Sequence, residues 1–232
     1  MEEVGDALGA EAAAEDVQVL LGPGLNIKRS PLGGRNFEYL SEDPFLTGKL
    51  AAAFVRGIQG RGVAACPKHF AVNSQETHRM TVDEIVDRRA LHEIFLEGFR
   101  RAVVEGRPRT IMTSYNRVNG TYAHENPYLL TDVLREGWGF DGMVVSDWGG
   151  SFDRVAATRA GASLEMPSTD GMTDREVIDA VRAGSLDEAV LDARVDEVLT
   201  VALAERGRPC RRCPTTRPTP APSTRPHGRW CC

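Results

Sequence analysis

The sequence lacks the long apolar run that a membrane-spanning helix requires. No stretch of the 232 residues approaches the roughly 18 consecutive apolar residues of such a helix. Met1-Glu2-Glu3 begins an acidic, helix-like stretch rather than the basic start of a signal peptide. We therefore expect no membrane partner, no visible export signal and, by default, a cytoplasmic location.

Cysteine is almost absent from most of the chain. Four of the five cysteines lie in residues 207–232, which leaves Cys66 alone in the rest of the sequence. This distribution excludes a disulfide framework as the basis of the fold. The terminal cysteines superficially resemble a zinc site, but adjacent cysteines among arginines and prolines argue against one. We expect neither a metal nor a cofactor.

Basic residues are scarce outside the same terminal segment. The net charge is -5, and residues 207–232 hold six arginines and no acid, so residues 1–206 carry about -11. An acidic body of this kind argues against a nucleic-acid partner. The terminal mixture of Arg, Pro, Thr and Cys has no apolar periodicity. Residues 207–232 are therefore predicted to be a disordered Arg/Pro/Cys-rich tail.

Short apolar runs alternate with helical periodicity through residues 1–206. The predicted strands are 17–21, 63–66, 110–113, 142–145 and 162–165. Strands that are each followed by a helix indicate an α/β fold with a parallel sheet. Gly22-Pro23-Gly24 lacks the phosphate-binding pattern that a doubly wound fold would place after its first strand. Since a closed barrel needs eight strands, we expect residues 1–206 to be one incomplete domain, a partial (β/α)₈ TIM-type barrel.

Two helix starts are predicted from capping residues. Asp43-Pro44 supplies an N-cap with proline at the first helical position, for a helix over 45–59. Thr81-x-x-Glu84 has the spacing of a capping box, for a long helix that ends near residue 105.

Polar and aromatic residues follow the predicted strands. Lys68-His69, Tyr115-Asn116 and Asp147-Trp148 stand where a barrel has its catalytic face. A carboxylate there can be a nucleophile, a general base or a metal ligand. The neighbouring cations and aromatics, with Arg35, suit the hydroxyls and the apolar face of a sugar better than they suit a metal. The sequence therefore predicts a sugar substrate.

Several longer motifs occur in order along the chain. They are Leu21-Gly22-Pro23-Gly24-Leu25-Asn26-Ile27, Gly34-Arg35-Asn36-Phe37-Glu38, Ser41-Glu42-Asp43-Pro44, Lys68-His69-Phe70, Met112-Thr113-Ser114-Tyr115-Asn116, Asn119-Gly120-Thr121-Tyr122 and Ser146-Asp147-Trp148. Together these motifs resemble the N-terminal barrel of glycoside hydrolase family 3, the β-glucosidase type. The resemblance runs from about residue 8 to residue 203.

The resemblance implies a retaining β-glycosidase, of the β-glucosidase or β-xylosidase type, that acts on small or oligosaccharide β-glycosides. Asp147 matches the nucleophile that forms a glycosyl-enzyme intermediate. Other positions match the sugar-binding residues of the family. These are the hydroxyl-binding Arg35, Lys68, His69 and Arg79, then Tyr115 near the anomeric centre, and Met112 and Trp148 as walls of the pocket.

Two departures from the family pattern are visible. Family members carry earlier barrel segments, with a sugar-binding Asp, that have no counterpart before Glu2. In β-glucosidase-type members a C-terminal α/β domain packs on the barrel and supplies the acid/base, whereas this chain continues into residues 207–232. The loop 71–79 also lacks the Pro-Gly-His-Gly pattern with which the β-N-acetylglucosaminidase branch supplies a His acid. We expect the chain alone to be impaired or inactive.

Simpler interpretations remain open for each residue. Asp147 can be a helix N-cap or turn residue, and Arg35 can pair with Glu38 or Glu42.

Alternatives also remain for the pocket walls and for the function. Met112 and Trp148 can be core residues, and Lys68 can be the Schiff-base lysine of a lyase. The whole chain can equally be a non-catalytic or inactive sugar-binding fragment.

Overall fold

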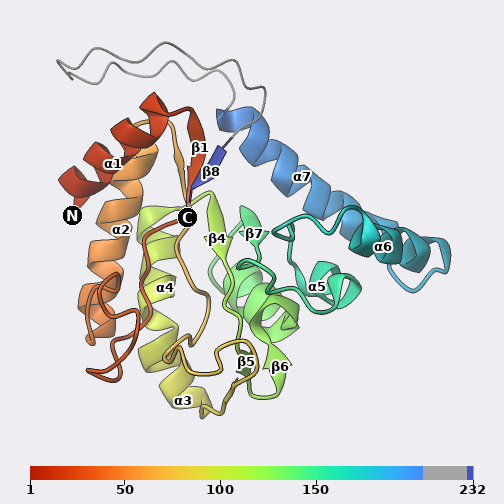
Figure 1. Ribbon diagram of the computed structural model, residues 1–232, viewed down its shortest axis with the longest axis horizontal. Helices are drawn as coiled ribbons and strands as arrows, with labels where there is room; N and C mark the ends of the chain where they lie inside the picture. Colours follow the sequence, from red (N-terminus) through yellow and green to blue (C-terminus); the bar gives the residue numbers. More distant parts are fainter. Residues whose placement is uncertain (206–228, 232) are drawn as a thin grey trace.

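The computed structural model of the chain describes residues 1–205 and 229–231 (Figure 1). Most of the predicted disordered tail, residues 207–232, lies outside the described residues. Within the tail, Arg229–Cys231 form strand β8, which pairs in parallel with β1. These three residues thus form a strand where no secondary structure was predicted.

Parallel strands form the centre of the molecule. They are β1 (Val17–Leu20), β2 (Ala64–Ala65), β4 (Thr110–Met112) and β7 (Met143–Val145). β1 pairs with β2, and β4 pairs with β7. The N–H of Phe70 donates to the carbonyl of Met112 at 2.8 Å and connects the β2 segment to β4. The prediction of an α/β fold with parallel strands is confirmed.

The predicted strand 162–165 is only partly formed. Leu164 makes a single parallel bridge to Val145, next to β7. The order of parallel segments is therefore β8, β1, β2, β4, β7 and Leu164, and from β1 onward it follows the order along the chain.

Helices cover the strands (Figure 1). They are α1 (Glu2–Ala14), α2 (Pro44–Gly60), α3 (Arg88–Ala90), α4 (Glu97–Arg101), α5 (Arg154–Ala160), α6 (Met172–Arg182) and α7 (Glu188–Glu205), with the π-helical turns η1 (Leu91–Phe95), η2 (Ala102–Gly106) and η4 (Tyr128–Gly137) and the 3₁₀ turn η3 (Ala123–Glu125). The predicted N-cap of α2 is confirmed, because the Asp43 carboxylate accepts the N–H groups of Phe45 and Leu46. In the described part of the chain no helix combines the length and apolarity that crossing a membrane demands.

The predicted capping box at Thr81-x-x-Glu84 is wrong. Asp83–Glu84 form strand β3, which pairs with β5 (Arg117–Val118). The helix begins four residues later at Arg88, where the carboxylate of Asp87 caps it. The backbone groups of Asp83 and Glu84 are therefore used by a partner more than thirty residues away, which a local motif cannot reveal.

A β-hairpin accounts for that partner. Strands β5 and β6 (Thr121–Tyr122) are antiparallel and are joined by Asn119 and Gly120, which have φ values of 52° and 92°. Asn-Gly is the usual sequence of a two-residue hairpin turn with positive φ at both positions. The hairpin extends below the ends of β4 and β7 in Figure 1.

Two apolar clusters lie on opposite faces of β7. Val144 belongs to the cluster that includes Leu130 and Leu134 of η4. Met143 and Val145 belong to the other cluster, which includes Val201 of α7. The alternation follows from the pleat of a strand. Burial on both faces fixes β7, so the residue that follows it has a rigid support.

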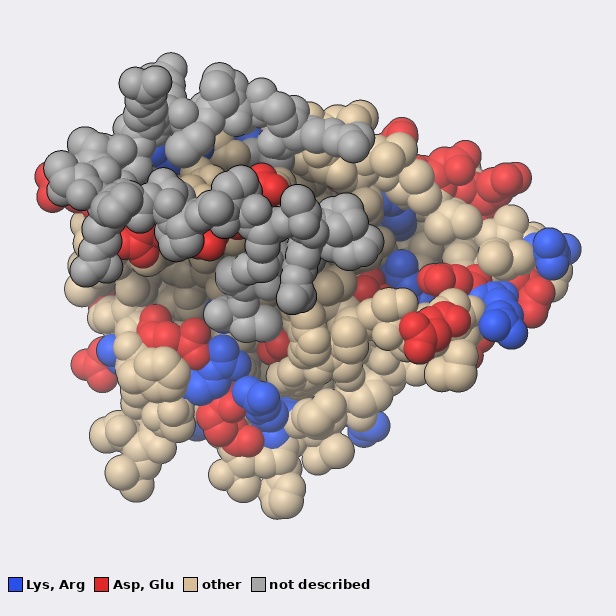
Figure 2. Space-filling view, turned by 45° about the horizontal axis from the view of Figure 1, so that its top comes forward, with Lys and Arg blue, Asp and Glu red and all other residues tan. Residues whose placement is uncertain are grey.

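The protruding end formed by α6 and α7 is charged. Figure 2 shows acidic and basic side chains close together on this end of the molecule. On α6 the exposed side chains of Arg182 and Asp179 form a pair whose charged atoms are 3.9 Å apart.

Candidate active site

Asp147 lies at the carboxyl end of β7, two residues after Val145. Its side chain is 13% exposed. The N–H of Trp148 donates to Asp147 Oδ1 at 2.8 Å, whereas the buried Oδ2 has no hydrogen-bond partner among the described residues. A buried carboxylate oxygen without a partner is costly, so this atom is a candidate for contact with a ligand.

His69 faces that carboxylate from the β2 segment. Its Nε2 lies 3.6 Å from Asp147 Oδ2, and its side chain is 1% exposed. Burial, followed by the charges of Arg35, Lys68 and Arg79, lowers the pKa of His69 well below 6.5. The imidazole is therefore neutral at pH 7, and its contact with Asp147 is not an ion pair.

The loop after β1 holds His69 in place. The Asn26 side chain accepts the N–H of His69 at 2.8 Å and donates to its carbonyl at 2.9 Å. The hydroxyl of Tyr39 lies 3.4 Å from Nδ1. If Tyr39 donates to Nδ1, the proton of the neutral ring is on Nε2 and points toward Asp147.

Arg35 and Lys68 share one carboxylate. Arg35 Nε lies 2.5 Å from Glu38 Oε1, and Lys68 Nζ lies 3.8 Å from Glu38 Oε2. The two cations are 18% and 12% exposed. The pairing of Arg35 with Glu38 that the sequence left open is therefore present. Glu38 sets the separation of two cations on neighbouring loops.

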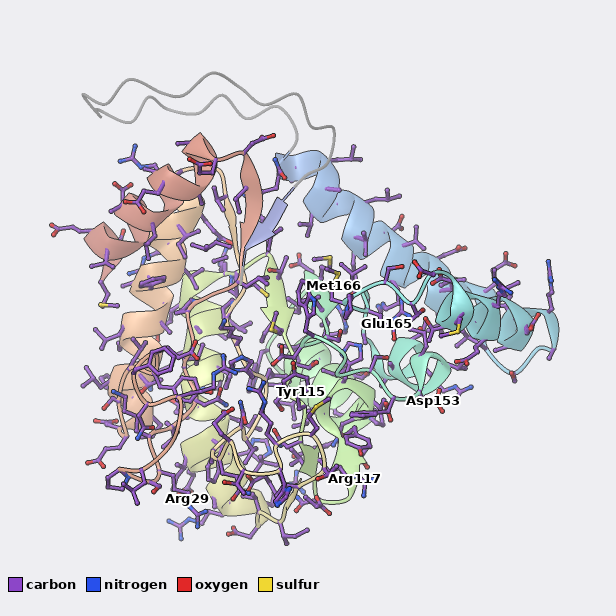
Figure 3. All side chains as sticks on the ribbon, in the orientation of Figure 1. Arg29, Tyr115, Arg117, Asp153, Glu165 and Met166 are labelled. Atoms are coloured by element: carbon purple, nitrogen blue, oxygen red, sulfur yellow. The ribbon has the colours of Figure 1, made fainter. Side chains whose placement is uncertain are left out.

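Arg79 and Tyr115 also lie near Asp147. The Arg79 guanidinium is 4.8 Å from the centroid of the Tyr115 ring, and its Nη1 is 2.8 Å from Glu76 Oε2. The Tyr115 hydroxyl donates to the carbonyl of Trp148 at 2.9 Å. Burial, followed by the charge of Asp147, raises the pKa of Tyr115 to about 12. Tyr115 is therefore a protonated hydrogen-bond donor near neutral pH. Figure 3 shows it below the strand ends, with Met166 and Glu165 above it and to its right.

The two predicted pocket walls differ in exposure. Trp148 is 37% exposed, which excludes a core position. Met112 is 2% exposed and packs with Cys66 and Val145, as the core alternative for this residue expects. The remaining predicted site residues all lie near Asp147. They are Arg35, Lys68, His69, Arg79 and Tyr115.

Some residues of this region were not predicted from the sequence. Glu38 was considered only as a salt-bridge partner, and Tyr39, Asn26 and Glu76 were not singled out. An acid next to an aromatic residue within one long loop was the available signal for Glu38 and Tyr39. In the described ranges, no three His, Cys, Asp or Glu side chains group in a way that could hold a metal.

Residues 1–201 match the family model described as the glycosyl hydrolase family 3 N terminal domain. The chain belongs to glycosyl hydrolase family 3. This family 3 chain is 55% identical over 201 residues to thermostable beta-glucosidase B of Acetivibrio thermocellus, covering 87% of this chain and 27% of the relative. It is 52% identical over 190 residues to an exo-alpha-(1->6)-L-arabinopyranosidase of Bifidobacterium longum, covering 82% of this chain and 25% of the relative.

Solved structures show the same similarity. Beta-glucosidase 3B from Thermotoga neapolitana in complex with alpha-D-glucose has a TM-score of 0.85 and 47% identity, covering 88% of the family 3 chain and 29% of that structure. A family 3 beta-glucosidase from Bifidobacterium adolescentis has a TM-score of 0.86, 47% identity and coverages of 88% and 30%. The family 3 chain thus spans roughly a quarter to a third of these proteins. The resemblance inferred from the motifs is confirmed.

Proposed function

We propose that this chain is the catalytic part of a retaining β-glycosidase, of the β-glucosidase or β-xylosidase type, with Asp147 as nucleophile. The observation that carries the proposal is the buried, unpartnered Oδ2 of Asp147, which faces a neutral His69 at 3.6 Å. A strand-end carboxylate with one free oxygen is suited to attack an anomeric carbon. The names of the similar beta-glucosidases support the reaction class.

In the proposed reaction Asp147 Oδ2 attacks the anomeric carbon while the bond to the leaving oxygen breaks. The leaving oxygen takes a proton from an acid, and the sugar remains as an ester on Asp147. Water then attacks the same carbon, gives a proton to the conjugate base and releases the carboxylate. Arg35, Lys68, His69 and Arg79 donate hydrogen bonds to the sugar hydroxyls, and Trp148 covers its apolar face.

We propose that the acid lies outside this chain, in a C-terminal α/β domain of a longer protein. A retaining mechanism needs a second carboxyl about 5 Å from the nucleophile. Glu38 and Glu76, the two acids described beside the site residues, are each paired with an arginine. Positioned acid/base groups contribute roughly 10² to 10⁴-fold, so the chain alone is expected to be impaired.

The parallel order of β1, β2, β4, β7 and Leu164 supports a partial (β/α)₈ barrel over residues 1–206. In such a barrel the candidate site occupies the carboxyl ends of the strands, the usual position of active sites in this fold.

The test uses a substrate that needs no acid. In a dinitrophenyl β-glucoside with fluorine in place of the hydroxyl beside the anomeric carbon, the leaving group departs without a proton and the ester breaks down slowly. We expect intact-protein mass spectrometry to show one added fluoroglucosyl group, and peptide mapping to place it on Asp147. Asp147→Ala should remove the label. Asp141→Asn changes an exposed acid six residues upstream and should keep it.

Labelling of Asp147→Ala would overturn the assignment of the nucleophile. Binding of glucose without any labelling would instead support the alternative of a non-catalytic sugar-binding fragment. No observation favours a Schiff-base lyase, since the Lys68 ammonium faces Glu38 rather than an apolar pocket.

A further inference from the structure

The side chain of Asp147 is held by few contacts of its own. The N–H of Trp148 donates to Oδ1 at 2.8 Å, and by geometry Oδ2 has no hydrogen-bond partner among the described residues. A strong hydrogen bond to Oδ2 would compete with the attack on the anomeric carbon, so this oxygen has to be aligned by other means. The groups that fix the main chain on either side of Asp147 therefore decide where Oδ2 points.

The main chain on both sides of Asp147 is bonded to one residue, Met166, which Figure 3 labels near the strand ends. Ser146 Oγ accepts the N–H of Met166 at 2.8 Å and donates to its carbonyl at 3.1 Å. The N–H of Gly149 donates to the same carbonyl at 2.8 Å. Asp147 thus lies between two attachments to a single residue of the neighbouring segment.

The Ser146 hydroxyl continues the pairing of two strand segments beyond their last main-chain bridge. Among the described residues, that bridge is the one between Val145 and Leu164, and the Ser146 N–H donates to the Leu164 carbonyl at 3.0 Å. A hydroxyl both accepts and donates, so one serine side chain serves the N–H and the carbonyl of Met166. Ser146 is 0% exposed, so bulk water does not replace these hydrogen bonds when they are lost.

We propose that Ser146 is a positioning residue for the attack by Asp147, because its two hydrogen bonds to Met166 hold the nucleophile in line with the anomeric carbon. A displacement of about 1 Å at a reacting group can lower a rate by about 10²-fold. Ser146 acts through the main chain of its neighbour and not through the sugar. This inference rests on the proposed function, because it needs attack by Asp147.

The chain offers a matched control in Ser163, which joins the same two segments nearer the amino end of β7. Ser163 Oγ accepts the N–H of Val144 at 2.9 Å and donates to Glu197 at 2.5 Å. Ser163 is 5% exposed. Ser163→Ala therefore also removes two buried hydrogen bonds of a serine, but at a point that does not adjoin Asp147.

The experiment follows labelling of the whole chain by the fluorinated dinitrophenyl β-glucoside, at several concentrations, by intact-protein mass spectrometry. Ser146→Ala should lower the rate at saturating glucoside by about 10- to 100-fold. It should change the half-saturating concentration of the glucoside and the calorimetric affinity for glucose by less than about 2-fold, since binding depends on the hydroxyl-binding cations.

Two further variants separate positioning from a general loss of structure. Ser146→Thr keeps the hydroxyl and should restore the rate to within about 3-fold of the unaltered chain. Ser163→Ala should change the rate by no more than about 3-fold. Circular dichroism shows whether each variant is folded. If Ser146→Ala does not fold, Ser146→Cys, with a weak donor and acceptor at the same position, takes its place and should lower the rate by about 3-fold or more.

The outcomes also distinguish this inference from the proposed function. If the folded Ser146 variant is labelled as fast as Ser163→Ala, or if its loss is confined to the half-saturating concentration, the positioning role is wrong and the proposed function stands. If the unaltered chain is not labelled on Asp147, the proposed function fails and the positioning role fails with it.

Discussion

Two carboxylates of this chain are buried to nearly the same extent but have opposite surroundings. Asp147 is 13% exposed and Glu197 of α7 is 10% exposed. Glu197 accepts hydrogen bonds from Ser163 at 2.5 Å and Arg135 at 2.8 Å, and it pairs with Arg194 at 2.6 Å. Asp147 Oδ1 accepts the N–H of Trp148, and the Tyr115 hydroxyl, which donates to the Trp148 carbonyl, also lies close to the carboxylate. By geometry, Oδ2 has no hydrogen-bond partner among the described residues.

The difference separates a structural carboxylate from one that is kept for a ligand. A buried charge is tolerated when all of its hydrogen-bonding capacity is used, as at Glu197, where the pairs connect α7 to η4. At Asp147, Oδ2 accepts no hydrogen bond from the described residues, although a neutral histidine and several cations lie nearby. Burial alone therefore does not distinguish the proposed nucleophile from Glu197, but the number of hydrogen-bond partners does.

The largest expected effect is on labelling by the fluorinated glucoside. Asp147→Asn should lower the labelling rate by about 10³-fold or more, since it removes the attacking group. Glu197→Gln should change the rate by no more than about 3-fold, because Glu197 does not touch the site. Mass spectrometry of both variants over time gives the rates. A comparable loss in both variants would abolish the distinction between the two carboxylates.

The order of the two effects should be reversed for the free energy of unfolding, which Glu197→Gln should lower more than Asp147→Asn does. Glu197→Gln leaves Arg135 and Arg194 without their carboxylate and should lower the free energy of unfolding by about 3 kcal/mol. Asp147→Asn should change it by less than about 1 kcal/mol, since no cation loses a close partner. Urea titrations followed by circular dichroism measure both. An equal loss in the two variants would mean that Asp147 is also structural.

Acid should destabilise the folded chain through its buried histidines. Burial lowers the pKa of His124 to about 3, below the 6.5 of an unfolded histidine. Between these values the unfolded chain binds a proton that the native chain does not, so stability is lost as the pH falls from 6.5. By pH 5 the loss from His124 should be about 2 kcal/mol. His69 acts in the same direction, and Glu197, whose pKa is raised chiefly by burial, acts in the opposite one.

The measurement is the difference in unfolding free energy between pH 7 and pH 5. His124→Asn should reduce this difference by about 2 kcal/mol. The control is His78→Asn, at an exposed loop position with φ 54°, which asparagine tolerates. If His124→Asn leaves the pH dependence unchanged, His124 does not control it.

The smallest expected effect concerns Glu38, an acid paired with cations like Glu197, whose partners Arg35 and Lys68 are proposed to bind the sugar. Glu38→Gln should weaken glucose binding about 5-fold, through the loss of the shared anchor of Arg35 and Lys68. Glu38→Asp should restore part of the affinity. Glu42→Gln, at an exposed acid of the same loop, should have no effect. Calorimetric titration with glucose distinguishes these outcomes.

Most of the fold could be predicted because its signals are local. The buried runs before Gly22 and around Val144 placed their strands to within one or two residues, and Asp43 capped its helix as expected. The helix start predicted from the capping box at Thr81 was wrong, since the pairing of β3 with β5 depends on a hairpin far along the chain.

The candidate site was predictable only in part for the same reason. The motifs supplied the residues around Asp147, but the contact of Asn26 with His69 spans 43 residues and leaves no pattern in the sequence. The sharing of Glu38 by Arg35 and Lys68 likewise arises only when two loops meet. Met112 was predicted as a pocket wall but is a core residue, because its motif does not show which face of β4 it occupies.

The hydrogen bond from the Trp148 amide to Asp147 Oδ1 makes the two oxygens of the carboxylate unequal. In the proposed reaction the ester forms through Oδ2, and Oδ1 becomes the ester carbonyl that still faces the peptide. The choice of oxygen, and with it the stereochemistry of approach, is then set by main-chain atoms. Tyr115 holds the carbonyl of the same residue. Because both contacts use main-chain atoms of residue 148, exchange of its indole would leave them in place.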